Sequence, residues 1–174
     1  MRTDTEAVLI MGRVAALSVV CGLVLVGCLA ERPTTHVRHE LSDLSLAVEL
    51  PPHFGQPSRS LAGAWAWSAD EGLTTFEVAP ALPGDQGIET LADTVMPGQT
   101  VDYARAAEIG GMSGRERRTQ EPLGAMNRAV WTGFVEGPRG NLTLKLIIVQ
   151  PESADEFGEA FWRNLTTNLI QRVE

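Results

Sequence analysis

The segment NLTLKLIIVQ, residues Asn141–Gln150, constrains the architecture more than any other part of the chain. Its apolar side chains recur at every second residue, which is the period of a β-strand with one buried face: Leu142, Leu144, Leu146 and Ile148. Ile147 and Val149 make the second half apolar on the other face as well. This pattern is typical of a central strand covered on both sides. We therefore expect a sheet with this strand inside it and with other elements packed on each face.

Other segments with the same alternation are expected to be further strands of this sheet. Leu44–Leu50 ends at two prolines, and a turn joins Gly63–Ser68 to Leu73–Ala79, which predicts a hairpin. Three more strands are expected downstream: Val101–Ile109, Arg115–Glu121 and Asn127–Val135. We interpret the strongly charged Arg115–Glu121 as an edge strand, because charged side chains prevent edge-to-edge pairing.

Two segments have the spacing of an amphipathic helix. Ile88–Val95 is short and is followed by Pro97. The C-terminal segment starts with a capping box, Ser153 and Glu156, and its apolar side chains recur every four residues: Phe157, Phe161, Leu165 and Leu169. The sequence thus predicts an α+β fold with a single domain over residues 41–174. In it, a mostly antiparallel sheet of about six to seven strands is covered by helices on both faces, as an α/β/α sandwich.

The N-terminal part of the chain contains an apolar run, VAALSVVCGLVLVGC, from Val14 to Cys28. At 1.5 Å per residue, the uncharged part before Cys28 spans about 21 Å as a helix, whereas a bilayer core is about 30 Å thick. The run is therefore short for a membrane span and typical of a signal peptide. The preceding positive charge is weak, and a start at Met11 would place MGR directly before the run.

The end of this run, Leu25-Val26-Gly27-Cys28, resembles the bacterial lipobox. The resemblance implies that the signal peptide is residues 1–27, that the sulfur of Cys28 receives lipid, and that acyl chains hold the protein to a membrane. Residues 28–40 are then expected to be a polar tether. The alternatives are an uncleaved membrane anchor and an ordinary signal peptide cut near Ala30. Because Leu29 and not Asp follows the cysteine, the resemblance implies the periplasmic face of the outer membrane in a Gram-negative cell.

Composition limits the function further. The chain has a net charge of −8, and removal of residues 1–27 leaves this value unchanged, which disfavours nucleic acid as a partner. Cys21 lies in the predicted signal peptide, so the mature chain keeps only Cys28 and has no intramolecular disulfide. Its stability must then come from a packed core.

No catalytic, metal or cofactor motif is present in the sequence. His36 and His39 are the only histidines at a close spacing, and they lie in the predicted tether without further ligands nearby. Ser113 lacks the final glycine of the G-x-S-x-G elbow, because Arg115 stands there. We therefore predict no catalytic residues, no metal and no cofactor.

Two groups of residues are candidates for binding. Trp65 and Trp67 share one face of a predicted strand, and we expect them in the core, with a ring-stacking ligand pocket as the alternative. A cluster of arginines on an acidic domain is the candidate patch for a protein partner: Arg105, Arg115, Arg117 and Arg118.

The element order, together with the pattern L-x-V-x-L-P-P-x-F at Leu46–Phe54, resembles the α/β/α sandwich superfamily of the photosystem II extrinsic protein P and the Ran-binding nuclear-import factor. Bacterial members of that superfamily include small envelope lipoproteins. The resemblance implies a non-catalytic binding or assembly factor, and it assigns no functional residue in this chain.

Three functions follow as hypotheses. The first is a lipid-anchored envelope lipoprotein whose domain docks on an envelope protein that the sequence does not identify. The second is a carrier of a small ligand beside Trp65 and Trp67. The third is an envelope enzyme of a type that no motif reveals. The sequence leaves the oligomeric state open.

Overall fold

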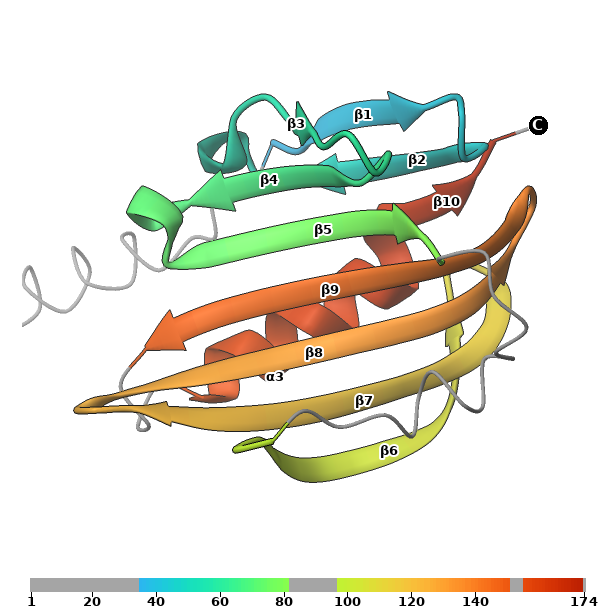
Figure 1. The fold of residues 1–174 in the computed structure, drawn as a ribbon. Helices are drawn as coiled ribbons and strands as arrows, with labels where there is room; N and C mark the ends of the chain where they lie inside the picture. Colours follow the sequence, from blue (N-terminus) through green and yellow to red (C-terminus); the bar gives the residue numbers. More distant parts are fainter. Residues whose placement is uncertain (1–34, 82–96, 151–154, 174) are drawn as a thin grey trace, which may run out of the picture. The chain divides into compact units, whose positions relative to one another are not determined.

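The computed structural model describes residues 35–81, 97–150 and 155–173 (Figure 1). This part of the chain forms a seven-stranded sheet, a three-stranded sheet and one α-helix. The predicted signal peptide, Cys28 and the predicted helix Ile88–Val95 lie outside the described residues.

The large sheet is antiparallel throughout, with its strands in the order β3-β4-β5-β9-β8-β7-β6. Its strands are β3 Ser58–Arg59, β4 Trp65–Ala69, β5 Thr74–Pro80, β6 Thr100–Ile109, β7 Met112–Leu123, β8 Met126–Gly137 and β9 Gly140–Gln150. The predicted central strand is confirmed, because β9 has three strands on either side of it. Its apolar side chains at Leu144 and Leu146 are fully buried.

The small sheet joins the two ends of the folded domain. β1 (Val37–Leu41), β2 (Leu46–Leu50) and β10 (Ile170–Arg172) pair antiparallel in the order β1-β2-β10. The predicted α+β class and the mostly antiparallel pairing are confirmed. The strands form two sheets and not one, since β2 pairs with the C-terminal β10 and has no partner in the large sheet.

Strand β1 begins inside the segment that we predicted as a tether, residues 28–40. Its alternate side chains are buried, but the sequence does not show this as apolar alternation, because one of the two inward-facing residues is the polar His39. Leu41 is the other, whereas Arg38 and Glu40 are exposed. The His39 ring lies edge-on to Trp67, with 5.5 Å between ring centroids. The folded domain therefore starts at least four residues earlier than predicted.

The charged segment that we predicted as an edge strand belongs to β7, which has β6 on one side and β8 on the other. This prediction was wrong because charge alone does not identify an edge. Arg118 forms an ion pair with Asp102 at 2.7 Å and lies over the Trp131 ring, so an inner strand accommodates it. The edge is β6, whose side chains are mostly exposed.

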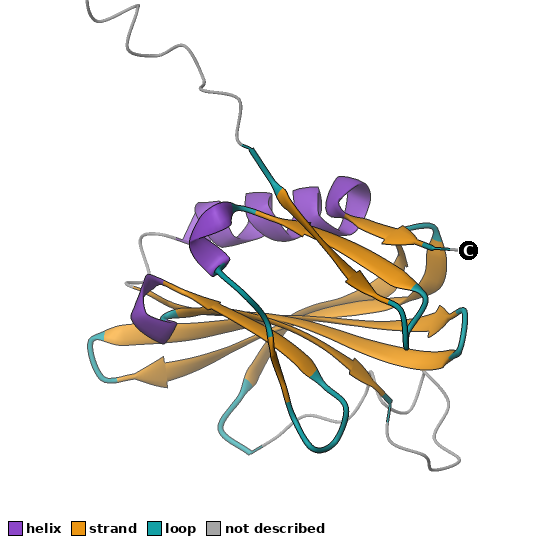
Figure 2. Ribbon diagram, turned by 90° about the horizontal axis from the view of Figure 1, so that it is seen from above, coloured by secondary structure: helices purple, strands orange, loops and turns teal. Residues whose placement is uncertain are grey.

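Helix α3 (Asp155–Asn164) lies against one face of the large sheet and continues into the π-helical turn η4 (Leu165–Leu169). Figure 2 shows α3 and the small sheet on the same side of the large sheet. The buried side of this helical segment carries Gly158, Trp162 and Leu165. We predicted Phe157 in the buried stripe, but its side chain is 68% exposed, because the core face of the helix is centred on Trp162.

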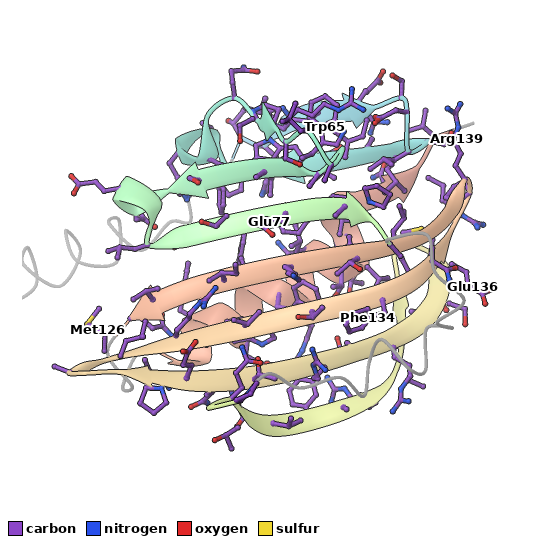
Figure 3. All side chains as sticks on the ribbon, viewed as in Figure 1. Trp65, Glu77, Met126, Phe134, Glu136 and Arg139 are labelled. Carbon is purple, nitrogen blue, oxygen red and sulfur yellow. The ribbon has the colours of Figure 1, made fainter. Side chains whose placement is uncertain are left out.

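The opposite face of the large sheet is also partly covered. Figure 3 shows Glu77 and Phe134 on this face, turned away from α3. Thr119, Thr132 and Phe134 belong to the same face by register, and all three are buried. Both faces of the inner strands are therefore shielded, as the two-sided apolar pattern of β9 indicated.

Candidate binding site at helix α3

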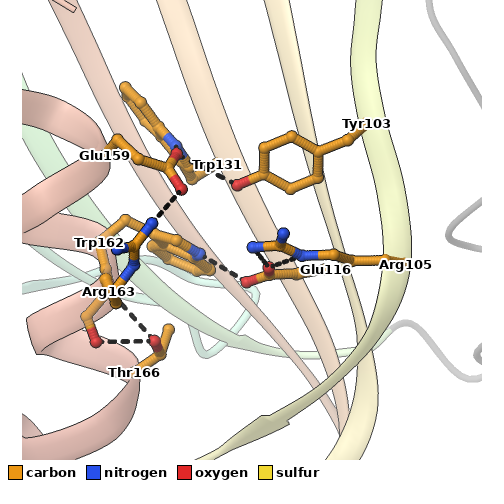
Figure 4. A network of polar contacts seen from close by, with 8 residues as sticks. All are labelled: Tyr103, Arg105, Glu116, Trp131, Glu159, Trp162, Arg163 and Thr166. Carbon is orange, nitrogen blue, oxygen red and sulfur yellow. Dashed lines mark hydrogen bonds and ion pairs between the residues drawn. The ribbon is translucent and has the colours of Figure 1, made fainter. Parts of the chain in front are cut away.

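Glu116 connects three elements of the fold at the edge of α3 (Figure 4). It lies on β7 and its residue is 7% exposed. The indole N–H of Trp162, on α3, donates a hydrogen bond of 2.9 Å to Oε2 of this carboxylate. Arg105, on β6, donates from Nε to Oε1 at 2.6 Å. The charge of Glu116 is thus buried with one cation and one N–H donor, as a buried carboxylate requires.

Glu159 forms the reverse connection, from α3 to the sheet. Its Oε2 accepts a hydrogen bond of 2.9 Å from the indole N–H of Trp131, on β8, and one of 3.3 Å from the hydroxyl of Tyr103, on β6. Arg163, one turn later on α3, lies 3.5 Å from Oε1. Helix α3 and the large sheet therefore each contribute one tryptophan and one glutamate to the contacts between them.

We call these side chains the Glu–Trp network: Tyr103, Arg105, Glu116, Trp131, Glu159 and Trp162. Hydrogen bonds to charged groups contribute about 1.5–3 kcal/mol each when they are well shielded. The network therefore fixes the position of α3 on the sheet more firmly than apolar packing alone. The rigid placement of α3 is useful for recognition, because a preorganised surface loses less entropy on binding.

The network shifts two protonation equilibria. Burial raises the pKa of Tyr103 above its ordinary value, and the negative charges of Glu116 and Glu159 raise it further. The hydrogen bond to Glu116 raises the pKa of Arg105. Both shifts favour the protonated forms, so the Tyr103 hydroxyl and the Arg105 guanidinium keep their donor hydrogens.

A surface cavity of about 200 Å³ opens beside the network, between α3 and β6. Arg105 and Glu108 of β6 line one side, and Glu159, Arg163 and Thr166 line the other. Thr166 donates its hydroxyl hydrogen to a backbone carbonyl of α3, so it adds no free donor here. The cavity offers charges of both signs at the edge of α3, as expected for the polar rim of a binding surface.

The other flank of α3 carries three stacked aromatic rings, which we call the aromatic ladder: Phe54, Phe161 and Phe157. Phe54 lies in the turn η1 (Pro52–Phe54) and stacks on Phe161 at 5.8 Å between centroids, with 12° between the planes. Phe161 in turn stacks on Phe157 at 6.3 Å and 2°. Phe54 is buried and Phe157 is 68% exposed, so the ladder runs from the core to the surface.

The four arginines that we predicted as a patch lie on two faces of the sheet. Arg117 lies over the ring of Phe134, on the face opposite α3, and Arg115 is directly opposite Phe134 in the β7–β8 ladder. Arg105 and Arg118 lie on the α3 side, in ion pairs with Glu116 and Asp102. Of these four arginines, all of which the structure describes, Arg105 alone lines the cavity beside α3.

The two tryptophans that we predicted as core or ligand pocket have different environments. Trp67 is fully buried and stacks on Phe76 at 5.7 Å, so its ring offers no surface to a ligand. Trp65 is partly buried, donates its N–H to Asp43 at 3.2 Å and lies under the guanidinium of Arg59. The structure therefore does not bring them together as one exposed platform.

The sequence did not single out Glu116, Glu159 or Trp131 as site residues. Glu116 stands in the polar run RERRTQE, and Glu159 is one carboxylate among several in the C-terminal segment. Gly133, which lies opposite Glu116 in β8, leaves room for the Ile109 side chain, and a Cβ there would only touch the Trp162 ring. The pairing of Trp162 with Glu116 depends on tertiary structure and has no local sequence pattern.

In the described part of the chain, no group of three or more histidine, cysteine, aspartate or glutamate side chains lies close enough to hold a metal ion. Among the described helices, none is long and apolar enough to cross a membrane.

Comparison with known proteins identifies the fold. No protein-family model matches the chain, and no curated protein matches it in sequence. The solved structure of the cyanobacterial PsbP of a Synechocystis species is similar, with a TM-score of 0.53 over 82% of this chain and 95% of that chain, at 8% identity. The fold is that of PsbP and Mog1p. The structure of Mog1p, the Ran-binding protein of Saccharomyces cerevisiae, has a TM-score of 0.51 over 81% of this chain and 97% of that chain, at 10% identity.

Proposed function

We propose that this protein is a lipid-anchored lipoprotein of the bacterial cell envelope, and that its PsbP/Mog1-like domain binds a protein partner without catalysis. The exposed side of α3, which we call the α3 surface, is the proposed docking site. It comprises Phe157, Glu159, Ala160, Phe161 and Arg163.

The observation that carries this proposal is the exposure of Phe157 at the end of the aromatic ladder. Aromatic side chains at interfaces contribute large apolar area and commonly act as anchors for binding. Phe157 is held by Phe161, so its ring is positioned before a partner arrives. Glu159 and Arg163 supply a charged border on the other flank of the helix. Mog1p, which binds Ran, is an example of this fold in protein recognition.

The proposed location at the membrane rests on the lipobox resemblance at Leu25–Cys28. From Cys28 to the start of β1, the intervening residues 29–36 reach at most about 30 Å when fully extended. Val37 pairs with Leu50, which precedes η1 and the Phe54 end of the aromatic ladder. An anchor at Cys28 would thus bring the chain into the domain close to the proposed docking site, and the partner is expected at the same membrane.

The anchor is tested by replacing Cys28 with serine. Wild-type protein should incorporate an alkyne-labelled fatty acid, and mass spectrometry should find a mature N-terminus at a diacylated Cys28. The C28S variant should lose the label and leave the membrane fraction. Unchanged processing and membrane partitioning of C28S would contradict the lipid anchor.

The docking site is tested by photo-crosslinking in cells. A benzoylphenylalanine at position 157 should give one dominant crosslinked partner, identified by mass spectrometry, and the purified partner should bind the wild-type domain. Phe157→Ala should weaken this binding at least tenfold. Leu61→Ala is the matched control, because Leu61 is a fully exposed apolar side chain outside the α3 surface. Equal losses in both variants, or equal crosslinking from position 61, would contradict docking at α3.

A further inference from the structure

Strand β6 is the last strand at one margin of the large sheet, and no described strand pairs with its outer side (Figure 1). The strand at the other margin, β3, has only two residues. The register of β6 with β7 shifts between Val101 and Tyr103, and it is continuous from Tyr103 to Ile109. A long regular strand with an open edge is a template for pairing with another chain.

The turn after β6 determines which backbone groups of the strand point outward. Both turn residues, 110–111, are glycines with positive φ, as a two-residue type I′ turn requires. In such a hairpin the flanking residues, Ile109 and Met112, form a hydrogen-bonded pair, and every second pair along the ladder is then hydrogen-bonded. The residues between these pairs direct their N–H and C=O groups away from β7, and all three are exposed: Ala104, Ala106 and Glu108.

The cavity of about 200 Å³ beside α3 follows the same part of the edge, because Arg105, Ala106, Ala107 and Glu108 all line it. Arg105 projects to the α3 side, where it binds Glu116, and Ala107, two residues later, projects to the same side (Figure 4). In a strand added to β6, the side chain opposite Ala107 would also project to this side, toward the cavity. The volume is below the range of about 300–1,000 Å³ for drug-sized ligands and suits a single side chain.

The charges around the cavity favour a basic side chain there. Three glutamates line it, Glu108, Glu116 and Glu159, together with two arginines, Arg105 and Arg163. Arg105 and Glu116 form an ion pair, so the other three charged groups leave a negative excess. Oε1 of Glu159 has only a long contact of 3.5 Å with Arg163, whose side chain is 73% exposed. A cationic group in the cavity would therefore find an accessible carboxylate oxygen.

We propose that β6 binds an extended segment of the protein partner as an additional antiparallel strand, and that a lysine or arginine of this segment enters the cavity. The outward backbone groups of β6 hold the segment, and the basic side chain, opposite Ala107, contacts Glu159. This inference rests on the proposed protein binding and specifies the form of the partner. The α3 surface and the β6 edge border the same cavity, so one partner can contact both.

The test uses NMR of the ¹⁵N-labelled mature chain, residues 28–174, with the peptide acetyl-Thr-Val-Thr-Lys-Thr-Val-Thr-amide. Saturable shifts of the backbone amides of Ala104, Ala106 and Glu108 are expected. A matched peptide with glutamate in place of lysine should bind about tenfold more weakly, because opposite charges attract and like charges repel. N-methylation of the threonine after the lysine should also weaken binding about tenfold, since its N–H faces β6, whereas N-methylation of the next valine, whose N–H faces away, should not.

One variant assigns the binding to the edge. Ala106→Pro removes an outward N–H and none that bonds to β7, a position at which an edge strand accepts proline. It should weaken binding of the lysine peptide about tenfold or more, and the two N-methylated peptides decide the point if this variant does not fold. Leu61→Ala, at an exposed position outside β6 and α3, is the control and should bind as the wild type does.

Four results would overturn the proposal. They are no saturable shift at β6 with the lysine peptide, equal binding of the glutamate peptide, equal binding of the two N-methylated peptides, and wild-type affinity of folded Ala106→Pro. Concentration-dependent shifts of the same amides without peptide would assign the edge to a second copy of the chain and would also overturn it. Because the probe is a peptide of known sequence, such a failure leaves the crosslinking result at Phe157 and the lipid anchor unaffected.

Discussion

The four tryptophans of the chain form two pairs that differ in how their indole N–H groups are satisfied. Trp65 and Trp67 are two residues apart on β4, and Trp67 has its N–H buried without a hydrogen-bond partner in the structure. Trp131 and Trp162 are far apart in sequence, and each donates to a glutamate of the facing element. In the first pair, Trp67 fills space in the core and Trp65 is partly buried and donates to Asp43, whereas both members of the second pair fix the relative position of α3 and the sheet.

This difference teaches that similar burial does not imply a similar contribution to the fold. Trp67 and Trp162 are both almost completely buried. Loss of the Trp67 indole removes apolar contacts together with an unsatisfied donor. Loss of the Trp162 indole removes comparable contacts and also takes a donor from the buried carboxylate of Glu116. A buried charge that loses a partner is costly, because water does not replace the partner.

The largest predicted effect distinguishes the two pairs directly. Trp162→Phe should lower the free energy of unfolding by about 2–4 kcal/mol, through a smaller ring and a lost hydrogen bond to Glu116. The matched variant Trp67→Phe should cost about 1–2 kcal/mol, because it loses a similar volume and no hydrogen bond. Urea unfolding followed by circular dichroism measures both. An equal or greater loss for Trp67→Phe would show that the carboxylate contact adds nothing.

The sequence predicted those strands in which apolar and polar side chains alternate. The strands β4, β5, β8 and β9 follow from apolar side chains at every second residue, and the central position of β9 follows from its two apolar faces. The start of β1 and the burial of Glu116 were not predictable in this way. Both depend on which distant element covers a strand, and in β1 and β7 polar residues occupy some of the buried positions, so the sequence does not distinguish them from exposed neighbours.

The same limit applies to the candidate site. The helix containing Phe157 and Phe161 was predicted because its apolar residues recur every four positions. This spacing does not specify which of the apolar residues face the core. Trp162 and Gly158 take the central position because the Trp131 ring packs against the helix backbone there. Phe157 is displaced to the surface as a result. Its exposure, on which the proposed docking depends, is thus a consequence of tertiary packing.

The second prediction tests how closely α3 approaches Trp131. A Cβ atom at Gly158 would overlap the Trp131 ring in the present structure. Glycine to alanine inside an exposed helix normally stabilises by about 0.5–1 kcal/mol. Gly158→Ala should instead destabilise by about 1–3 kcal/mol, because overpacking would push the helix away from the sheet.

Two readouts separate these outcomes. Thermal unfolding of Gly158→Ala gives the sign of the stability change, and Ala160→Gly, at an exposed position of the same helix, gives the effect of propensity alone. A stabilised Gly158→Ala variant would mean that α3 is held less closely than described. In that case the difference between the two tryptophan pairs would also be smaller.

The smallest expected effect concerns Tyr103, the only tyrosine of the chain, which donates to the same carboxylate as Trp131. Because burial and the charges of Glu116 and Glu159 raise its pKa in the folded protein, the unfolded chain loses this proton first as pH rises. The contribution of Tyr103 to stability is therefore fully present below about pH 10 and declines above it. Ultraviolet absorbance should detect tyrosinate in the folded protein only well above pH 10, and in urea near pH 10. Tyr103→Phe should remove the part of the alkaline loss of stability that this group causes.

An ordinary titration near pH 10 in the folded state would contradict this prediction. The hydroxyl would then be in contact with solvent and not bonded to Glu159, and Trp131 would be the one sheet residue of the network that binds this carboxylate.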